Sequence, residues 1–370
     1  DWSSDVCSSD LAPRRCPGTG NRAGRAILTH WAATPDRQGT PRVRRRPPRA
    51  PRLASEVRMV TQLDVQLELL CDYECLVGEG PQWHDGEDRA YWVDIYRGAL
   101  YQYDPASGSH SEVFRSDLYL GGFTIQQDGT FVFFMQDGAI KHWDGQNLTP
   151  LFHRIATPHG TDIRFNDVSA DPAGRVFCGL TALMPSAERR RSLYRLDPDG
   201  SLRAVVDGLG CSNGMGFTPS RDAMYLTDSA DGVIWKYPYD VATGRLGERR
   251  AFVTVTGNGE GVPDGMTVDA EGYVWSARWG GHKLVRHHPD TGEVVAEIRF
   301  PVERVSSVTF GGPGYAHLYV TTARGMVEGP NGPEVADPVV PAGALYRVDM
   351  SALGIHGIAE PRTNCRLPDA

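Results

Sequence analysis

One local phrase recurs six times along the chain after Leu70, and this repetition constrains the fold more than any other feature. Each copy contains a polar turn with Gly or Asp, a short strand of alternating aromatic and aliphatic residues, a second turn and another short strand. The copies begin at Asp85, Gln127, Asp171, Pro219, Asp269 and Gly311. Their spacing of about 45 residues is the length of one four-stranded blade of a β-propeller.

The alternation within each copy explains why the copies must assemble. Because large and polar residues alternate, one face of every hairpin has to be buried. A ring of stacked sheets covers all of these faces, and runs such as residues 91–93 (YWV) and 274–275 (VW) supply bulk between neighbouring sheets. Two β-sandwiches, the rival arrangement, would not give one repeated phrase. The sequence therefore predicts an all-β protein, a six-bladed β-propeller.

Residues 1–58 differ from the repeated part in composition and in pattern. They carry 12 Arg, no Lys and five acidic residues, a net charge of +7, and they show neither strand nor helix periodicity. Residues 41–49 (PRVRRRPPR) form a basic, proline-rich run typical of disorder, and residues 1–11 resemble a translated sequencing adapter. We expect residues 1–58 to be a disordered or artefactual leader and residues 59–370, from Met59 onward, to form the propeller domain. The alternative is a basic targeting or nucleic-acid-binding arm.

Composition restricts the classes of binding partner and the cellular compartment that we expect for this protein. The whole chain carries a net charge of -8, so the part after residue 58 carries -15, and such an acidic body lacks the basic face that phosphate binding requires. No apolar run reaches the length of about 18 residues that a transmembrane helix needs, and no signal-peptide pattern stands near the start. Five cysteines follow residue 58, with a spacing that fits neither a disulfide framework nor a zinc site. We therefore expect a cytoplasmic protein with reduced thiols that binds neither nucleic acid nor a membrane.

Four segments place a polar residue beside Gly or another polar residue at the head of an apolar strand. They are residues 78–83 (GEGPQW), 164–168 (RFNDV), 212–217 (SNGMGF) and 263–268 (PDGMTV). Taken singly, an Asn-Gly or Asp-Gly pair is most often a hairpin turn. Because the segments recur at similar offsets before four of the repeats, we expect their side chains to meet at one end of the central tunnel.

The oxygen-rich side chains in these segments indicate a cation. Glu79, Asn166, Asn213 and Asp264 offer two carboxylates and two amide carbonyls. Such ligands suit a hard ion such as Ca²⁺, Mg²⁺ or Mn²⁺. Zn²⁺ also accepts them, so the sequence leaves the identity of the one divalent cation open.

The four segments, in this order, resemble the SMP-30/gluconolactonase/regucalcin family, and the resemblance extends from residue 68 to residue 359. It implies a six-bladed propeller that holds one divalent cation through Glu79, Asn213 and Asp264. It also implies that Arg164 and Asn166 contact the substrate and that Asp264 transfers a proton. The chain departs from the family pattern at residues 179–181 (GLT) and in the basic loop 184–191, and both departures bear on the substrate rather than on the cation.

The resemblance also implies an activity, the metal-dependent hydrolysis of a sugar-acid lactone to an aldonic acid in the manner of a gluconolactonase. The partner would then be a small-molecule sugar lactone. Neither a His-Glu-x-x-His motif nor a phosphate-binding loop is present to favour another catalytic design. Two alternatives stay open, another metal-dependent esterase or phosphotriesterase on the same propeller and a calcium-binding propeller without catalytic activity. The sequence specifies neither the sugar nor the oligomeric state.

Overall fold

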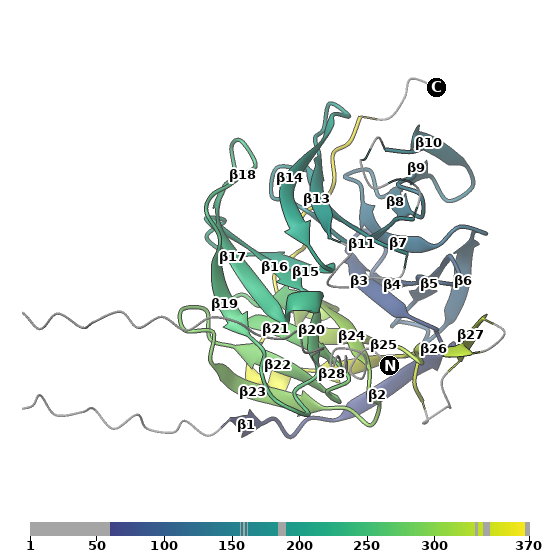
Figure 1. The fold of residues 1–370 in the computed structure, drawn as a ribbon. Coiled ribbons are helices and arrows are strands. Elements are labelled where there is room, and N and C mark those ends of the chain that lie inside the picture. The colour runs from purple at the N-terminus through teal and green to yellow at the C-terminus, as the bar shows by residue number, and fades with distance from the viewer. Residues whose placement is uncertain are drawn as a thin grey trace, which may run out of the picture. The chain divides into compact units, whose positions relative to one another are not determined.

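The computed structural model describes residues 60–155, 157, 160, 162–183, 190–329, 332–335 and 341–366 (Figure 1). The expected leader, residues 1–58, lies outside the described residues, and so does most of the basic loop 184–191. The expectations about these two segments therefore stay predictions.

The described chain folds into six sheets of four or five strands, antiparallel except for the pairing of β1, and one separate two-stranded hairpin, which confirms the predicted six-bladed β-propeller (Figure 1). Blade 1 contains β3 (Gly78–His84), β4 (Arg89–Asp94), β5 (Ala99–Tyr103) and β6 (His110–Arg115). Blade 2 contains β7 (Leu120–Ile125), β8 (Phe131–Met135), β9 (Ile140–Trp143) and β10 (Leu148–Phe152). Blade 3 contains β11 (Arg164–Ala170), β12 (Val176–Thr181), β13 (Arg191–Leu196) and β14 (Leu202–Leu209).

The remaining three blades carry additions to the four-stranded plan. Blade 4 contains β15 (Ser212–Phe217), β16 (Ala223–Asp228) and β17 (Val233–Asp240), and both β18 (Arg245–Leu246) and β19 (Arg250–Thr254) pair with β17. Blade 5 contains β20 (Val262–Val268), β21 (Val274–Trp279), β22 (Lys283–His287) and β23 (Val294–Arg299), with β1 (Thr61–Gln62) parallel to β23. Blade 6 contains β24 (Val305–Gly311), β25 (His317–Thr322), β28 (Ala344–Asp349) and β2 (Leu67–Asp72), and the hairpin β26 (Met326–Gly329) with β27 (Gly332–Val335) is inserted before β28. Three short 3-10 helices, η1 (Ser229–Asp231), η2 (Pro313–Tyr315) and η3 (Ser351–Leu353), complete the described elements.

Strands β3, β7, β11, β15, β20 and β24 contact one another in sequence around the centre of the ring and are called the inner strands below. The ring closes through β2, which directly precedes blade 1 in the sequence and pairs with β28 at the outer edge of the last blade. Closure by an N-terminal strand joins segments almost three hundred residues apart (Leu67 pairs with Val348) and leaves no open gap between the first and last blades.

Buried aromatic residues fill the spaces between blades, as the sequence predicts. Tyr91 and Val93 pack in one cluster with Phe123 of blade 2. Trp92, on the opposite face of the same strand, packs in another cluster with Tyr319 of blade 6. Each fully buried side chain of this kind contributes about 1.5–3 kcal/mol through removal of apolar surface from water, so both faces of each blade stabilise the ring.

A segment that we call the C-terminal strap, residues 355–366, crosses the floor of the propeller, meaning the end where the inner strands finish. One backbone bridge joins Gly357 to Asp269, directly after β20, and another joins Thr363 to Gln126, directly after β7. The Gln126 side chain also donates to the carbonyl and accepts from the amide of Cys365, at 3.0 Å each. The strap therefore ties opposite blades together at the floor.

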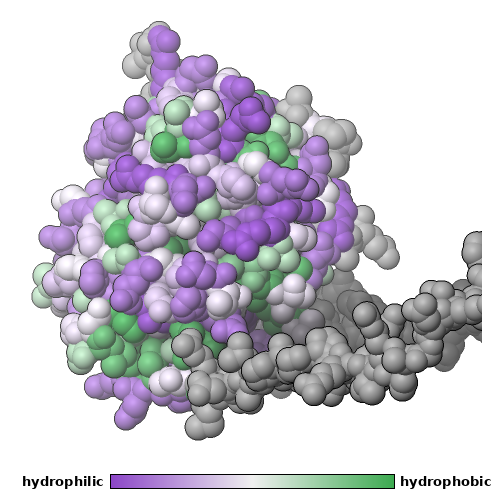
Figure 2. Space-filling view, turned by 90° about the vertical axis from the view of Figure 1, so that its left-hand side faces the viewer, coloured by the Kyte–Doolittle hydropathy of each residue, from purple (hydrophilic) through white to green (hydrophobic). Residues whose placement is uncertain are grey.

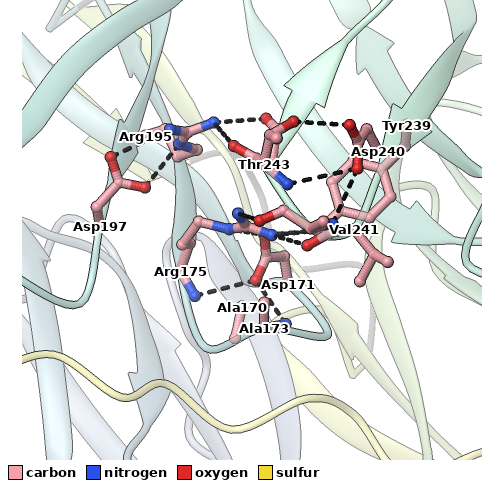
Figure 3. Close-up of polar contacts among 12 residues, drawn as sticks. Ala170, Asp171, Ala173, Arg175, Arg195, Asp197, Tyr239, Asp240, Val241 and Thr243 are labelled. Carbon is pink, nitrogen blue, oxygen red and sulfur yellow. Dashed lines mark hydrogen bonds and ion pairs between the residues drawn. The ribbon is translucent and has the colours of Figure 1, made fainter.

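A second tie links blade 3 to the β17–β18 hairpin of blade 4 (Figure 3). Arg175 donates from Nε to Asp171 at 2.5 Å and from Nη2 to the carbonyl of Val241 at 2.5 Å. Arg195 donates from Nη1 to the carbonyls of Thr243 and Gly244 at 3.0 and 2.6 Å. This group, which we call the hairpin clamp, comprises Asp171, Arg175, Arg195, Asp197 and residues 239–244.

The thiols of the described residues agree with the expectation from composition. The face in Figure 2 is mostly polar, with apolar residues in small separate patches. The described cysteines are free and buried, which confirms the expected thiols for this part of the chain: Cys71, Cys75, Cys178, Cys211 and Cys365. None of the described helices has the length and apolar character needed to cross a membrane.

Candidate functional site

Each inner strand contains one residue more than the stretch of the second strand of its blade with which it pairs. This extra residue lies close to the start of the inner strand. The shifts in register fall between Glu79 and Gln82, Leu120 and Gly122, Phe165 and Val168, Ser212 and Met215, Pro263 and Met266, and Val305 and Ser307. Such β-bulges interrupt the alternation of side chains and are frequent next to active sites.

The residues predicted for the site lie in or beside these bulges. Asn166 lies within the bulge of β11, Asn213 within that of β15 and Asp264 within that of β20, while Glu79 directly precedes the bulge of β3. The structure therefore places all four at the same level of the ring, at the site end, where the inner strands begin. Arg164 opens β11 at this end.

The Asn-Gly and Asp-Gly pairs of the motifs lie on strands and form no hairpin turns. A Cβ at Gly214 would stand 2.5 Å from the backbone nitrogen of Met266, and one at Gly265 would stand 2.7 Å from Cα of Ser307. Both distances are too short for any side chain. Glycine is required here because neighbouring inner strands crowd together around the axis.

A hydrogen-bond chain fixes the orientation of the Asn213 amide. Ser229 donates to the carbonyl of Pro263 at 2.7 Å, so its oxygen can only accept from Asn213 Nδ2, at 3.1 Å. Asn213 Nδ2 also donates to Asp264 Oδ1. Both amide hydrogens are thereby used, and Asn213 Oδ1 is buried without a hydrogen-bond partner. A buried oxygen that accepts no hydrogen bond, such as Asn213 Oδ1, can bind a cation.

Three carboxylates, which we call the axial carboxylates, share this region: Glu79, Asp167 and Asp264. Burial raises the pKa of Glu79 well above its usual value, and the charges of Asp264 and then Asp167 raise it further. The pKa of Asp264 is also raised well above its usual value, first by burial and then by Asp167. Burial raises the pKa of Asp167 to about 7, against the lowering effect of Arg164. Negative charge is thus disfavoured at all three until positive charge is added.

Arg164 is a cationic side chain that acts on all three axial carboxylates. Its Nη1 donates to Asn166 Oδ1 at 2.6 Å, and its Cζ lies 5.7 Å from the centroid of the Tyr96 ring. Asn166 Nδ2 donates in turn to the carbonyl of Ser212 at 2.8 Å. Asn166 therefore holds the guanidinium in place, and the Arg164 Nε–H stays buried without a partner.

The residue types at the site fit a divalent cation, although no finished ligand cage is present. Among the described residues, no three His, Cys, Asp or Glu side chains converge on one point as metal ligands. Asp264 is hydrogen-bonded to Asn213 instead. The fit rests on the unpartnered oxygen of Asn213 and on buried carboxylates that repel one another, a combination that a hard cation relieves.

Two features of the site were missed by the sequence analysis. Asp167 was part of a motif but received no role, because its neighbour Asn166 already pointed inward and a regular strand would turn Asp167 away. Residues 210–214 (GCSNG) also spell the Gly-x-Ser-x-Gly pattern of serine hydrolases. That pattern requires a strand-to-helix elbow that exposes the serine, whereas Ser212 opens strand β15 and is fully buried.

Comparison with known proteins identifies the family of this chain. Residues 77–324 match the family model described as "SMP-30/Gluconolactonase/LRE-like region". Pentonolactonase XacC of Haloferax volcanii is 43% identical over 283 residues, which cover 76% of this chain and 94% of the relative. Regucalcin of Xenopus laevis is 30% identical over 301 residues, covering 80% and 97%. The solved structure of a luciferin-regenerating enzyme matches with a TM-score of 0.72 at 26% identity, over 81% of this chain and 99% of that chain. As its sequence motifs predict, this chain belongs to the SMP-30/gluconolactonase/LRE-like family.

Proposed function

We propose that this protein is a divalent-cation-dependent lactonase that opens the ring of a sugar-acid lactone to give an aldonic acid. Its family and its relatives make it a lactone-hydrolysing enzyme that acts on an ester bond. Five-carbon aldonolactones are the first substrates to test, since a relative with 43% identity is named a pentonolactonase.

One observation carries the proposal: buried carboxylates that raise one another's pKa lie at the same end of the propeller axis as an unsatisfied amide oxygen and an arginine. Glu79 and Asp264 are 3% and 5% exposed, and no ion pair in the described residues neutralises either of them. Structural ion-pair networks place a guanidinium directly against such groups. Buried acids that lack this neutralisation favour a functional site.

The ligand set for the cation is proposed to be Glu79, Asn213 and Asp264. Two carboxylates and one amide oxygen suit Ca²⁺, Mg²⁺ or Mn²⁺, and Zn²⁺ is also compatible. A divalent cation bound there supplies positive charge that polarises the lactone carbonyl. Asn213 contributes orientation as well, because its amide hydrogens hold Ser229 and Asp264.

The protein residues carry the proton transfer and hold the substrate. Asp264 accepts a proton from the attacking water and returns it to the ring oxygen as the acyl C–O bond breaks. Burial raises the pKa of Asp264 in the cation-free protein, and a bound cation would favour its ionised form, in which the carboxylate can accept a proton. Arg164 orients the hydroxyl or carbonyl oxygens of the lactone with its free Nε–H, and Asn166 keeps the guanidinium aimed at them.

The test combines cation removal with a substrate series. Protein treated with a chelator is assayed on pentono- and hexono-lactones before and after Ca²⁺, Mg²⁺, Mn²⁺ or Zn²⁺ is returned, and cation binding is measured by calorimetry. We expect turnover only with cation, and we expect Glu79→Gln to lose both cation binding and turnover. The exposed Glu248→Gln is the matched control and keeps both. Full activity of chelator-treated Glu79→Gln would refute the proposed function.

A further inference from the structure

A cavity of about 50 Å³ continues from the site end along the propeller axis toward the floor. Residues from each of the six inner strands line it, which identifies it as axial. Asp167 belongs to its lining at the site end, and Glu360 and Pro361 of the C-terminal strap belong to its lining at the floor. At 10–15 Å³ for each, the cavity has room for roughly three water molecules.

The strap holds Glu360 in this position through contacts on both sides of it. On one side Gly357 donates its amide to the carbonyl of Tyr315 at 2.9 Å, and on the other Thr363 donates to the carbonyl of Ile125 at 2.9 Å. The Glu360 carboxylate accepts a hydrogen bond from Thr309 Oγ1 at 2.8 Å. Its position is thus fixed by blades 2 and 6 together.

Glu360 also borders a second, larger space on the floor. This groove has a volume of about 660 Å³ and is lined by the strap, by Gln127 of blade 2 and by residues of blades 3, 4 and 5. Four residues line both the axial cavity and the groove: Ser169, Met215, Glu360 and Pro361. Among these four, Glu360 alone carries a titratable side chain.

The charges that face Glu360 let it bind and release a proton near neutral pH. Burial raises the pKa of Glu360 to about 7, the Thr309 hydrogen bond and Arg362 lower it, and Asp85 raises it. Asp167 shares the axial cavity, and Arg221 shares the groove. None of these is a proposed cation ligand.

Hydrolysis of a lactone at neutral pH releases one proton. Water adds to the carbonyl carbon, the acyl C–O bond breaks, the ring oxygen becomes a hydroxyl, and the new carboxylic acid ionises to a carboxylate and one proton. The axial cavity is lined at the site end by Asp167, whose charge acts on Glu79 and Asp264, and it leads away from that end toward Glu360. We propose that Glu360 accepts this proton through the axial cavity and releases it into the floor groove. The inference rests on the proposed lactonase activity.

The decisive experiment compares turnover in dilute and in concentrated imidazole buffer, with lactone loss followed by NMR so that the readout does not depend on buffering. Glu360→Gln keeps the oxygen that accepts from Thr309 but cannot take up a proton. We expect its kcat to fall about tenfold in dilute buffer, less than the 10²–10⁴-fold of a transfer within the transition state, and to recover in concentrated imidazole. Glu360→Asp, which restores a carboxyl group, should recover part of the rate in dilute buffer.

Proton transfer through Glu360 is called the relay below. Two comparisons distinguish a failure of the relay from a structural effect of the substitution and from a failure of the proposed function. Glu248→Gln, which removes an exposed carboxylate far from both cavities, should match the wild type in both buffers. The relay is overturned if Glu360→Gln equals the wild type in dilute buffer, or if its loss is not restored by imidazole. A wild-type protein without lactonase activity in either buffer would instead overturn the proposed function, and the relay with it.

Discussion

The axial carboxylates and the hairpin clamp both bury acidic side chains, yet their surroundings are opposite. Asp171 in the clamp accepts from Arg175 Nε at 2.5 Å, from Tyr239 at 2.7 Å and from two backbone amides (Figure 3). Glu79 at the axis accepts one hydrogen bond, from the amide of Gly80, and its pKa is raised by other acids. The clamp satisfies its charges within the protein, whereas no ion pair in the described residues neutralises Glu79 or Asp264 at the axis, which supports the proposed cation site.

This difference separates a structural use of buried charge from a functional one. A buried acid with a full set of donors stabilises the folded state, and removing its partner is costly. A buried acid among like charges destabilises the folded state until a cation arrives. Substitutions in the two regions should therefore have opposite effects on stability and on turnover.

The largest effect is expected for Asp264→Asn at the axis. We expect kcat to fall by about 10³-fold, because a proton acceptor and a cation ligand are lost together. The free energy of unfolding of cation-free protein should rise or stay equal, because one of the repelling charges disappears. Steady-state kinetics and urea denaturation of the same preparations check both statements. A clear decrease in the free energy of unfolding of cation-free Asp264→Asn would show that Asp264, like Asp171, stabilises the fold.

The next largest effect is expected in the clamp, for Arg175→Met. Asp171 would stay buried without its guanidinium, and Val241 would lose a donor. We expect a loss of about 3 kcal/mol in the free energy of unfolding, at the low end for a broken buried pair because Tyr239 still donates. Urea denaturation measures the loss, and kcat of the folded fraction should not change. Tyr239→Phe is the milder control at about 1 kcal/mol.

A third expectation concerns pH and cation together. The pKa of Asp167 is raised to about 7 and those of Glu79 and Asp264 are raised well above their usual values, so these groups hold protons more tightly when folded. Their contribution to the stability of cation-free protein is complete below about pH 4 and is lost as pH rises through the raised values. A bound cation favours the ionised forms and removes this loss.

Calorimetric unfolding at several pH values tests this expectation. At one fixed cation concentration, 100 times the dissociation constant at pH 8, the stabilisation by cation should grow from a small value near pH 5 to about 2.7 kcal/mol near pH 8. Arg175→Met should keep the same pH dependence, since the clamp does not involve the axial carboxylates. A cation effect that shrinks with rising pH would contradict the assignment of the axial carboxylates.

The fold was accessible from the sequence because the same phrase of two short apolar strands and two turns recurs in every blade, as in β4 and β5. The inner strands were harder to recognise, since their glycines imitate turns. Gly214 and Gly265 follow Asn and Asp, the usual signature of a hairpin, but they are required by the approach of neighbouring strands within 2.5–2.7 Å of a Cβ. Crowding around the axis is a property of the closed ring and has no local sequence signal.

The candidate site was predicted in part for a related reason. Family motifs pointed to Glu79, Arg164, Asn213 and Asp264, and the structure brings these to one end of the axis; their roles stay predictions. Asp167 was not predicted as a site residue, because a regular strand turns successive side chains to opposite faces. The bulge between Phe165 and Val168 breaks that rule. A bulge arises from pairing with β12, which the sequence of β11 alone does not reveal.

The smallest of the expected effects tests whether Arg164 belongs to the axis or to the structural class of Arg175. Arg164 contacts Asn166 and the Tyr96 ring but has no carboxylate within ion-pair distance in the described residues, which is consistent with its proposed role in substrate binding. We expect Arg164→Ala to raise KM about tenfold with a smaller change in kcat, because substrate binding is lost in the ground state and transition state alike. Arg164→Lys should recover little, since an ammonium cannot both donate to Asn166 and stack on Tyr96 as the planar group does. The opposite outcome is that Arg164→Ala lowers the free energy of unfolding by as much as Arg175→Met does and leaves KM unchanged. Arg164 would then be structural, and the two regions would differ only in their carboxylates.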